Sequence, residues 1–132
     1  MSDTVRNVGF EADIDTVQAI IPVAYTTSST PIVSSAIDRT SYPRKRMLVT
    51  VSCKADATST GVTPTVTESE TSGGGYTACT LGAGTFAATN SAASQTVSVR
   101  WNKAKPFVKV TMTPAGGSGV VAATVHFLGD PV

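Results

Sequence analysis

The sequence offers few side chains for acid–base or nucleophilic chemistry. His126 is its only histidine, so any Ser-His-Asp or Cys-His arrangement would need this residue as its base. Because His126 alternates with Val125 and Phe127, it is expected to face solvent or an interface rather than the core. Glu68 and Glu70 share one face of a predicted strand, and we interpret them as a solvated pair rather than as paired catalytic carboxylates. The sequence therefore predicts no catalytic site and no enzymatic activity.

The remaining motifs do not indicate a metal or cofactor site. Cys53 and Cys79 are too few for a disulfide scaffold and lack the spacing of zinc ligands, so we expect two buried thiols. A bridge between them would require their strands to be neighbours. The glycine clusters at 73–75 and 116–119 lack the Gly-Lys-Ser/Thr ending of a phosphate-binding loop and predict turns. We expect neither a cofactor nor a metal.

One concentration of positive charge lies in the polar stretch 38–46. It contains Arg39, Arg44, Lys45 and Arg46 but a single aromatic residue, whereas surfaces that bind single-stranded nucleic acid interleave basic and aromatic side chains. The net charge of +1 also argues against a dedicated nucleic-acid binder. The stretch is either a solvated loop or a loop that docks on an acidic protein surface, and we prefer the second interpretation.

Composition favours a single β-rich domain. The chain has 132 residues, of which 41% are hydrophobic and 14% are charged, below the roughly 25% charged residues usual in soluble domains. Abundant Thr, Val and Ser, with Gly and Pro at intervals, favour strands over helices. Since no apolar run approaches the ~20 residues needed to span a bilayer and no signal segment is recognisable, we expect no membrane association.

Short alternating runs predict about eight strands. Met47, Val49 and Val51 belong to the cleanest alternation, which indicates a half-buried antiparallel strand. Pro22 and Pro64 cannot donate ladder hydrogen bonds, so their strands are expected to lie at an edge or to contain a bulge. The predicted strands are 17–25, 31–37, 47–54, 62–70, 76–81, 95–101, 106–112 and 120–128.

The two C-terminal runs, 106–112 and 120–128, are expected to form a β-hairpin around the turn formers at 113–119. A hairpin needs further strands over its apolar face to be stable. We therefore predict an all-β fold, an antiparallel β-sandwich of about eight strands, with a jelly roll favoured and an immunoglobulin-like sandwich as the alternative. The predicted core consists of Val49, Val51, Val97, Val99, Trp101, Val108, Val110, Val125 and Phe127.

Residues 1–16 lack a sustained period but carry apolar anchors at Val5, Val8, Phe10 and Ile14. They form either a partly ordered tail or an extended arm whose apolar residues dock on a partner. We divide the chain accordingly into an N-terminal arm at 1–16 and a single β-sandwich domain at 17–132. The weakly charged surface and the proline-containing edge strands further predict a homo-oligomer, either a dimer or a trimer.

Three segments carry a resemblance to a known group of proteins. They are AIDRTSY at 36–42, the hairpin from VTESE at 66–70 to YT at 76–77, and the ending VAATVHFLGDP at 121–131. Together they resemble small structural proteins of tailed bacteriophages, and within that group the chain is similar to capsid decoration, or cement, proteins of the small jelly-roll type. The turn at 73–75 is Gly-Gly-Gly, where hairpins of this type usually carry Asp-Gly.

The resemblance implies a non-enzymatic virion protein that is made in the host cytoplasm, binds the outer surface of the major capsid protein lattice and stabilises the head. Such proteins clamp the seams between capsid subunits, so contacts from more than one surface are expected. The residues expected to bind the capsid are Val5, Val8, Phe10, Ile14, Arg39, Arg44, Lys45 and Arg46. The alternative is a carbohydrate- or receptor-binding β-module of a phage tail or fibre, which would need several exposed aromatic side chains.

Overall fold

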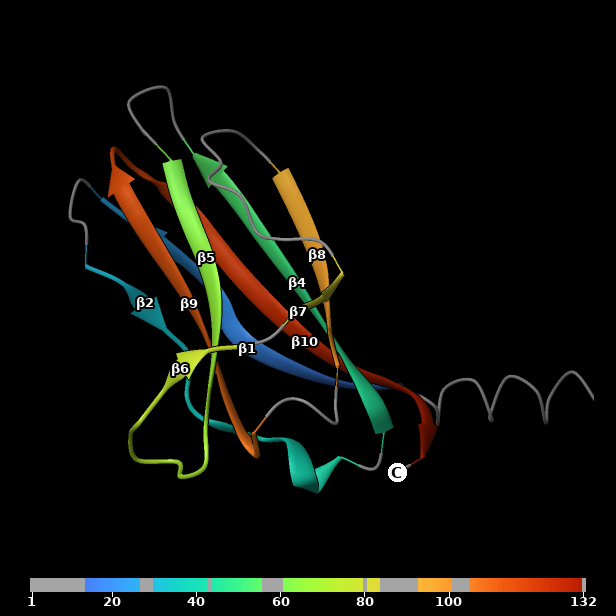
Figure 1. Ribbon diagram of the computed structural model, residues 1–132. Helices are drawn as coiled ribbons and strands as arrows, with labels where there is room; N and C mark the ends of the chain where they lie inside the picture. The colour runs from blue at the N-terminus through green and yellow to red at the C-terminus, as the bar shows by residue number, and fades with distance from the viewer. Residues whose placement is uncertain are drawn as a thin grey trace, which may run out of the picture.

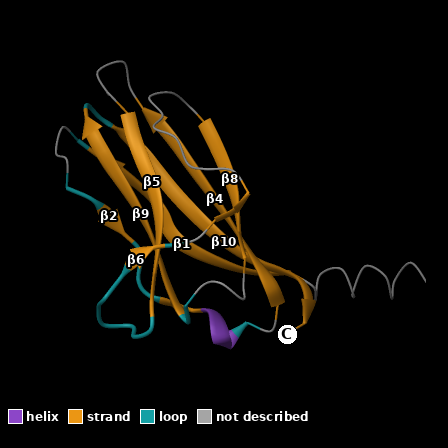
Figure 2. Cartoon of the chain, viewed as in Figure 1, coloured by secondary structure: helices purple, strands orange, loops and turns teal. Residues whose placement is uncertain are grey.

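Two antiparallel β-sheets packed face to face make up the fold (Figure 1). The computed structural model of the chain describes residues 14–26, 30–42, 44–55, 61–79, 81–83, 93–100 and 105–131. These residues form ten strands and one short 3-10 helix, η1 (Arg39–Ser41), which Figure 2 shows at one end of the sandwich. The expectation of an all-β sandwich is confirmed.

Each sheet draws its strands from distant parts of the chain. Sheet A has the order β1 (Ile14–Tyr25), β10 (Gly119–Pro131), β4 (Arg44–Ala55), β8 (Ala93–Arg100) and β7 (Leu81–Ala83). Sheet B has the order β2 (Ile32–Val33), β9 (Phe107–Gly116), β5 (Gly61–Ser69) and β6 (Thr77–Ala78), and β3 (Ile37–Asp38) also pairs with β9. In Figure 1, β9 and β5 cross in front of β1 and β10.

The strand order is that of a jelly roll, as the sequence favoured. The chain repeatedly crosses between the sheets, and the eight strands that define the topology have the orders β1-β10-β4-β8 and β2-β9-β5-β6. This wiring places the first and last strands of the chain side by side and gives two Greek keys. In an immunoglobulin sandwich the first strand pairs with the second, whereas here β1 pairs with β10. The immunoglobulin-like alternative is therefore wrong.

The C-terminal hairpin expected from 106–112 and 120–128 is also wrong. β9 belongs to sheet B and β10 to sheet A, so the two strands face each other across the sandwich instead of pairing. Gly117, with a φ of 73°, lies in the connection and adopts a left-handed conformation that glycine reaches without a steric penalty. The two runs do share a buried side, since Val110 and Val125 both point inward.

The hairpin expected between 66–70 and 76–77 is confirmed. Thr67 lies opposite Ala78 and Glu68 lies opposite Thr77, so β5 and β6 pair directly. Gly75, in the connection, has a φ of 73°, which explains why the turn carries glycine there. The expected strand at 76–81 is shorter than predicted, because β6 ends at Ala78 and β7 joins the other sheet.

The strand expected at 31–37 is interrupted at Ser34. The Ser34 backbone N–H donates to the Val110 carbonyl at 2.9 Å, and the Ser34 hydroxyl oxygen accepts from the Val110 N–H at 3.0 Å. A side chain thus replaces one backbone partner in the ladder. The segment consequently divides into β2 and β3, which both run along β9.

The core lies between the sheets and follows the predicted parity. Met47, Val49 and Val51 of β4 are buried, as the alternation indicated. Tyr42 stacks on Phe127 with 4.3 Å between ring centroids and 5° between ring planes, and this pair packs beside η1. The other predicted core residues that are buried are Val97, Val99, Val108, Val110, Val125 and Phe127, while Trp101 lies outside the described residues.

Both prolines that indicated an edge or a bulge lie where pairing is incomplete. β1 is the outermost strand of sheet A, and its register shifts between Ile20 and Val23, around Pro22. Pro64 lies in β5 opposite Met112 of β9. Since β6 pairs only with Thr67 and Glu68, the Pro64 half of β5 has no second strand beside it among the described residues.

We expect Val51→Asp to destabilise the domain by roughly 3 kcal/mol or more, because it buries an unpaired charge between the sheets. Thr50→Asp is the matched control, since Thr50 is the adjacent residue of β4 and faces outward. Chemical denaturation of both variants checks the register. Equal stability of the two variants would contradict it.

Candidate interaction surface

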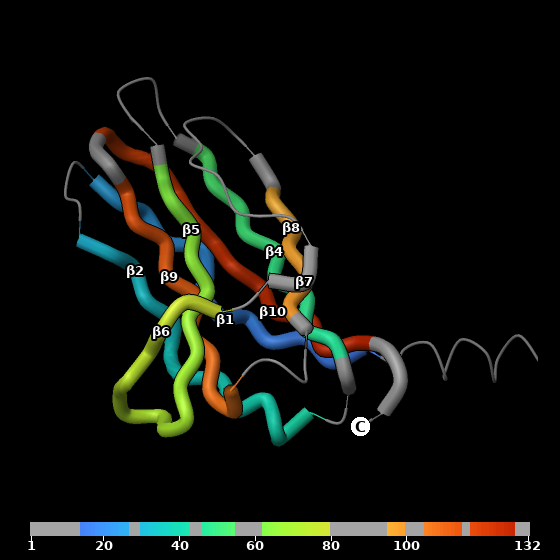
Figure 3. The backbone as a smooth tube through the Cα atoms, viewed as in Figure 1, coloured from blue at the N-terminus to red at the C-terminus, as the bar shows by residue number. Residues whose placement is uncertain are grey.

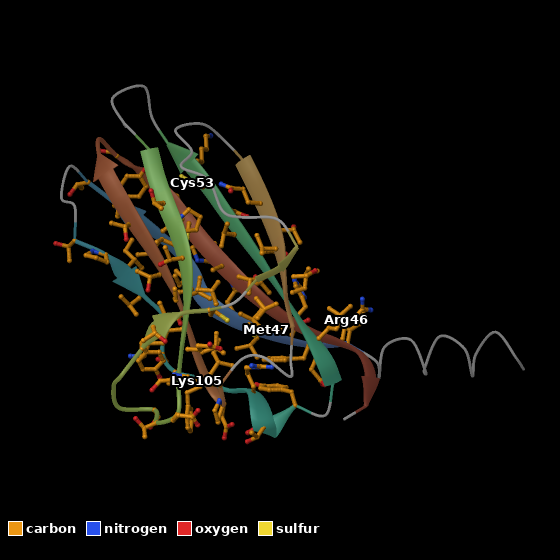
Figure 4. All side chains as sticks on the ribbon, in the orientation of Figure 1. Arg46, Met47, Cys53 and Lys105 are labelled. Atoms are coloured by element: carbon orange, nitrogen blue, oxygen red, sulfur yellow. The ribbon has the colours of Figure 1, made fainter. Side chains whose placement is uncertain are left out.

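A basic corner forms at the end of sheet A where β4 begins. It consists of Arg44, Lys45 and Arg46 in β4 and Arg100 in β8, and Arg46 and Arg100 occupy directly opposite positions. The Arg46 side chain is exposed, and Figure 4 shows it outside the sandwich while Met47 lies within it. Residues 44–46 are therefore strand, not the loop that the sequence indicated.

Arg100 was missed by the sequence analysis, although a signal was present. Arg100 continues the alternating run of β8 that contains buried Val97 and Val99, and its position in the register is opposite Arg46. Like charges at directly opposite positions of an antiparallel pair are destabilising.

Arg39 does not belong to this exposed corner, and its expected place in a surface loop is wrong. It is only 1% exposed, and its Nη1 donates to the Lys105 carbonyl at 3.2 Å. Its backbone N–H donates to the Pro106 carbonyl at 2.9 Å. The turn of η1 directs Arg39 inward, because Asp38 caps the helix through a hydrogen bond from the Thr40 N–H at 2.9 Å.

Glu68 is buried as well, so the interpretation of Glu68 and Glu70 as a solvated pair is wrong for Glu68. Its exposed fraction is 5%, whereas Glu70 is exposed. Glu68 Oε2 accepts from the Lys105 N–H at 2.7 Å and from Cys79 Sγ at 3.6 Å. The parity that Glu68 shares with buried Val66 was the sequence signal for its inward direction.

A buried polar cluster consists of Arg39, Glu68 and Cys79. Arg39 and Glu68 both hydrogen-bond to the backbone of Lys105. Burial lowers the pKa of Arg39, and attraction to Cys79 and Glu68 opposes this shift. Burial, together with the charge and the hydrogen bond of Glu68, raises the pKa of Cys79 to about 12, and the charge of Arg39 opposes this shift. The thiol therefore stays protonated at neutral pH and donates to Glu68, which makes Cys79 a poor nucleophile.

Both cysteines are buried free thiols, as expected. Cys53 lies in β4 of sheet A, and Figure 4 shows it among the side chains between the sheets, whereas Cys79 follows β6 of sheet B. Burial raises the pKa of Cys53, and a hydrogen bond with Tyr25 opposes the shift. Neither thiol has the low pKa and exposure that reactive cysteines need.

Of the four expected N-terminal anchors, three precede β1 in the sequence and one is its first residue. Val5, Val8 and Phe10 lie outside the described residues. Ile14 is the first residue of β1, lies opposite Leu128 and is 36% exposed. Residues 14–16 therefore belong to sheet A rather than to the arm in which the sequence division placed them.

The outer faces of both sheets are rich in hydroxyl side chains. In sheet A, one row across four strands consists of Gln18, Thr124, Thr50 and Thr96. His126 lies on the same outer face, as its alternation predicted, with Nδ1 3.3 Å from Thr16 Oγ1. In sheet B, Thr63 lies opposite Thr113 and Thr65 opposite Thr111. These faces offer hydrogen bonds with little charge.

Exposed apolar residues occur on β1 and β2, the first strands of the two sheets, whose courses Figure 3 traces. Ile21 is 69% exposed, and Pro22, Val23 and Ala24 after it are also exposed. Val33 of β2 is a further exposed apolar residue. Four consecutive exposed apolar residues at a sheet edge are unusual for a monomer and are typical of a contact surface.

The described residues contain no group of three or more His, Cys, Asp or Glu side chains that could hold a metal ion. No helix in the described residues is long and apolar enough to cross a membrane. The basic corner and the exposed apolar edge are therefore the two candidate surfaces among the described residues.

Neither a family model nor a curated protein matches the chain. Among solved structures, the chain is similar to PirA, with a TM-score of 0.52, 8% identity and coverage of 86% of this chain and 95% of PirA. It is also similar to part of a structure of infectious bursal disease virus, Gt strain, with a TM-score of 0.51, 11% identity and coverage of 86% of this chain and 30% of the viral chain. These likenesses support the fold alone.

We expect the pKa of Cys79 to make the protein less stable at alkaline pH. The unfolded thiol ionises near its ordinary value of 9.0, whereas the folded thiol ionises only near 12, so the free energy of unfolding decreases as pH rises from 9.0 towards about 12. At about pH 11 the loss from this group is on the order of 2 kcal/mol.

Denaturant titrations of the wild type and Cys79→Ser between neutral and alkaline pH isolate the effect, because every other titrating group is common to both proteins. The hydroxyl of Ser does not ionise in this range, so the variant should lose less stability than the wild type. Parallel pH profiles for the two proteins would show that Cys79 ionises without the expected shift.

Proposed function

We propose that this chain is a non-enzymatic decoration protein of a phage virion, which binds the outer surface of the major capsid protein lattice and stabilises the head. The observation that carries the proposal is the jelly-roll strand order, since the sequence resembles phage decoration proteins of the small jelly-roll type. The viral chain with a similar fold supports the fold part of this argument. The protein acts on the capsid exterior, after synthesis in the host cytoplasm.

The buried polar groups support a structural role. Arg39, Glu68 and Cys79 are buried and contact one another or the backbone of Lys105. Such groups stabilise the end of the sandwich next to η1. What remains on the surface is a pair of Thr-rich faces, a basic corner and an apolar edge, and these features are suited to adhesion.

The basic corner lies at the end of sheet A where β1 begins, and the N-terminal arm precedes β1 in the sequence. Ile14, Leu128, Arg46 and Arg100 form one row across four strands of sheet A. Since neighbouring strands lie about 5 Å apart, the start of β1 is roughly 10 Å from Arg46 in β4. The corner docks on an acidic capsid surface, while the arm with Val5, Val8 and Phe10 reaches a neighbouring capsid subunit.

Two linked contacts explain how a small domain clamps a seam. Each contact alone is modest, but the second forms within an already bound molecule, so the joint affinity exceeds either one. Only contacts on both sides of a seam oppose its separation when the head is heated or pressurised. The basic corner governs association because charge complementarity acts mainly on the rate of encounter.

The described aromatic side chains do not favour the carbohydrate- or receptor-binding alternative. Tyr25 is buried, and Tyr42 is stacked on Phe127. The Tyr76 ring is occupied by Lys109, whose Nζ lies 4.6 Å from the ring centroid. A sugar-binding face needs aromatic rings that are free to stack on a ligand, and these three are engaged within the protein.

We expect Arg46→Glu to weaken binding to undecorated capsids by about tenfold or more and to reduce the salt dependence of association, because it reverses a charge at the centre of the basic corner. Lys54→Glu is the matched control. Lys54 lies on the same exposed face of β4 but at its other end, opposite Val120. Co-sedimentation with capsids at low and moderate salt measures both variants.

The two variants carry the same change in net charge, so a general electrostatic effect would weaken them equally. Equal binding of the two variants would contradict the assignment of the basic corner. Failure of the wild type to bind capsids under any of these conditions would contradict the proposed function itself.

A further inference from the structure

We infer that the first part of β1, residues 14–18, is a pairing edge for the same strand of a second copy of this chain. β1 is the outermost strand of sheet A and pairs only with β10 in the described part of the chain. The outward backbone groups of an edge strand are a template for another strand. Pairing of two copies joins their A sheets into one continuous sheet with a twofold axis. This inference does not depend on the proposed function.

Residues 14–18 are the regular part of this edge. They pair in unbroken register with Leu128 back to Thr124, and the register shifts begin only after Gln18. Natural edge strands are commonly protected by Lys, Pro or a bulge. In β1 the bulges and Pro22 protect the second half, whereas residues 14–18 contain no Lys, Arg or Pro. Pairing is therefore blocked in one half of the strand and left open in the other.

The side chains of this stretch fit a copy of themselves. With the twofold axis at Thr16, Ile14 lies opposite Gln18 of the second copy, and Asp15 lies opposite Val17. The single charge of the stretch thus meets an uncharged residue, whereas an axis at Asp15 would oppose two carboxylates. Val17 and Ala19 pack against the core but are only partly buried, so a second strand beside them would complete their burial.

The other short edges in the described residues are poor competitors. β7 has three residues with a register shift, and β6, β2 and β3 have two each. Pro64 interrupts the half of β5 that β6 does not cover, and residues 93–97 of β8 are the rival edge that Thr96→Lys tests below. A contact between β1 and a different edge would also be head-to-tail and would not close on itself. The length of β1 and its self-complementarity therefore favour a closed dimer of identical edges.

The axis at Thr16 gives a charge-swap test in the full-length chain. Thr16 is exposed, and Thr16→Lys places two like charges directly opposite each other, as does Thr16→Asp. Each variant alone should dissociate at least tenfold more readily than the wild type, and an equimolar mixture of the two should recover the dimer through a Lys–Asp pair. Thr96→Lys is the control, since Thr96 is exposed on the same face but lies in β8.

Sedimentation velocity over about a hundredfold range of concentration measures the mass relative to the 13.5 kDa of one chain. A wild type that dimerises, single Thr16 variants that do not, and a mixture that does would support the inference. Circular dichroism of each variant verifies folding, and recovery in the mixture excludes misfolding as the cause. A wild type that stays monomeric, or a dimer unaffected by either Thr16 variant, would overturn it.

Discussion

The central strands β4, β5, β9 and β10 bury every second side chain against the opposite sheet, and the rest of the structure depends on this packing. Val49 of β4, Val110 of β9 and Val125 of β10 all lie in this layer and are fully buried. A slip of one residue in any strand would exchange its apolar face for its polar one, so the packing fixes the register of both sheets. It also determines what remains outside, which is mostly Thr and Ser.

The same constraint explains why charged groups occur inside. The parity of β5 directs Glu68 inward after Val62 and Val66, and a buried carboxylate is tolerated only with partners. Those partners come from other segments: the Lys105 N–H, the Cys79 thiol and the attraction of Arg39. The polar cluster thereby ties η1, β5 and the segment before β9 together.

The sequence predicted which face of each strand is buried but not which strands are neighbours. In β4, the strict alternation at 47–54 was sufficient to predict the buried face, because burial of one face leaves an alternating pattern of apolar and polar residues in the local sequence. The apolar runs of β9 and β10 have the same pattern whether they pair in one sheet or face each other from two, so the hairpin was predicted wrongly. Pairing depends on contacts between distant residues, such as Ile14 with Leu128, and these leave no local signal.

The charged residues were the least predictable part of the candidate surface. Local sequence places Arg39 beside Arg44 and Lys45 in one polar stretch, yet its hydrogen-bond partner is residue 105. Arg100 lies 54 positions from Arg46 in sequence and opposite it in the sheet.

We propose that these surfaces hold the domain on a phage head, and cryo-electron microscopy of capsids with and without the purified protein tests this proposal most directly. We predict additional jelly-roll density on the outer capsid surface that touches more than one capsid subunit; identical particles in the two samples would contradict the account.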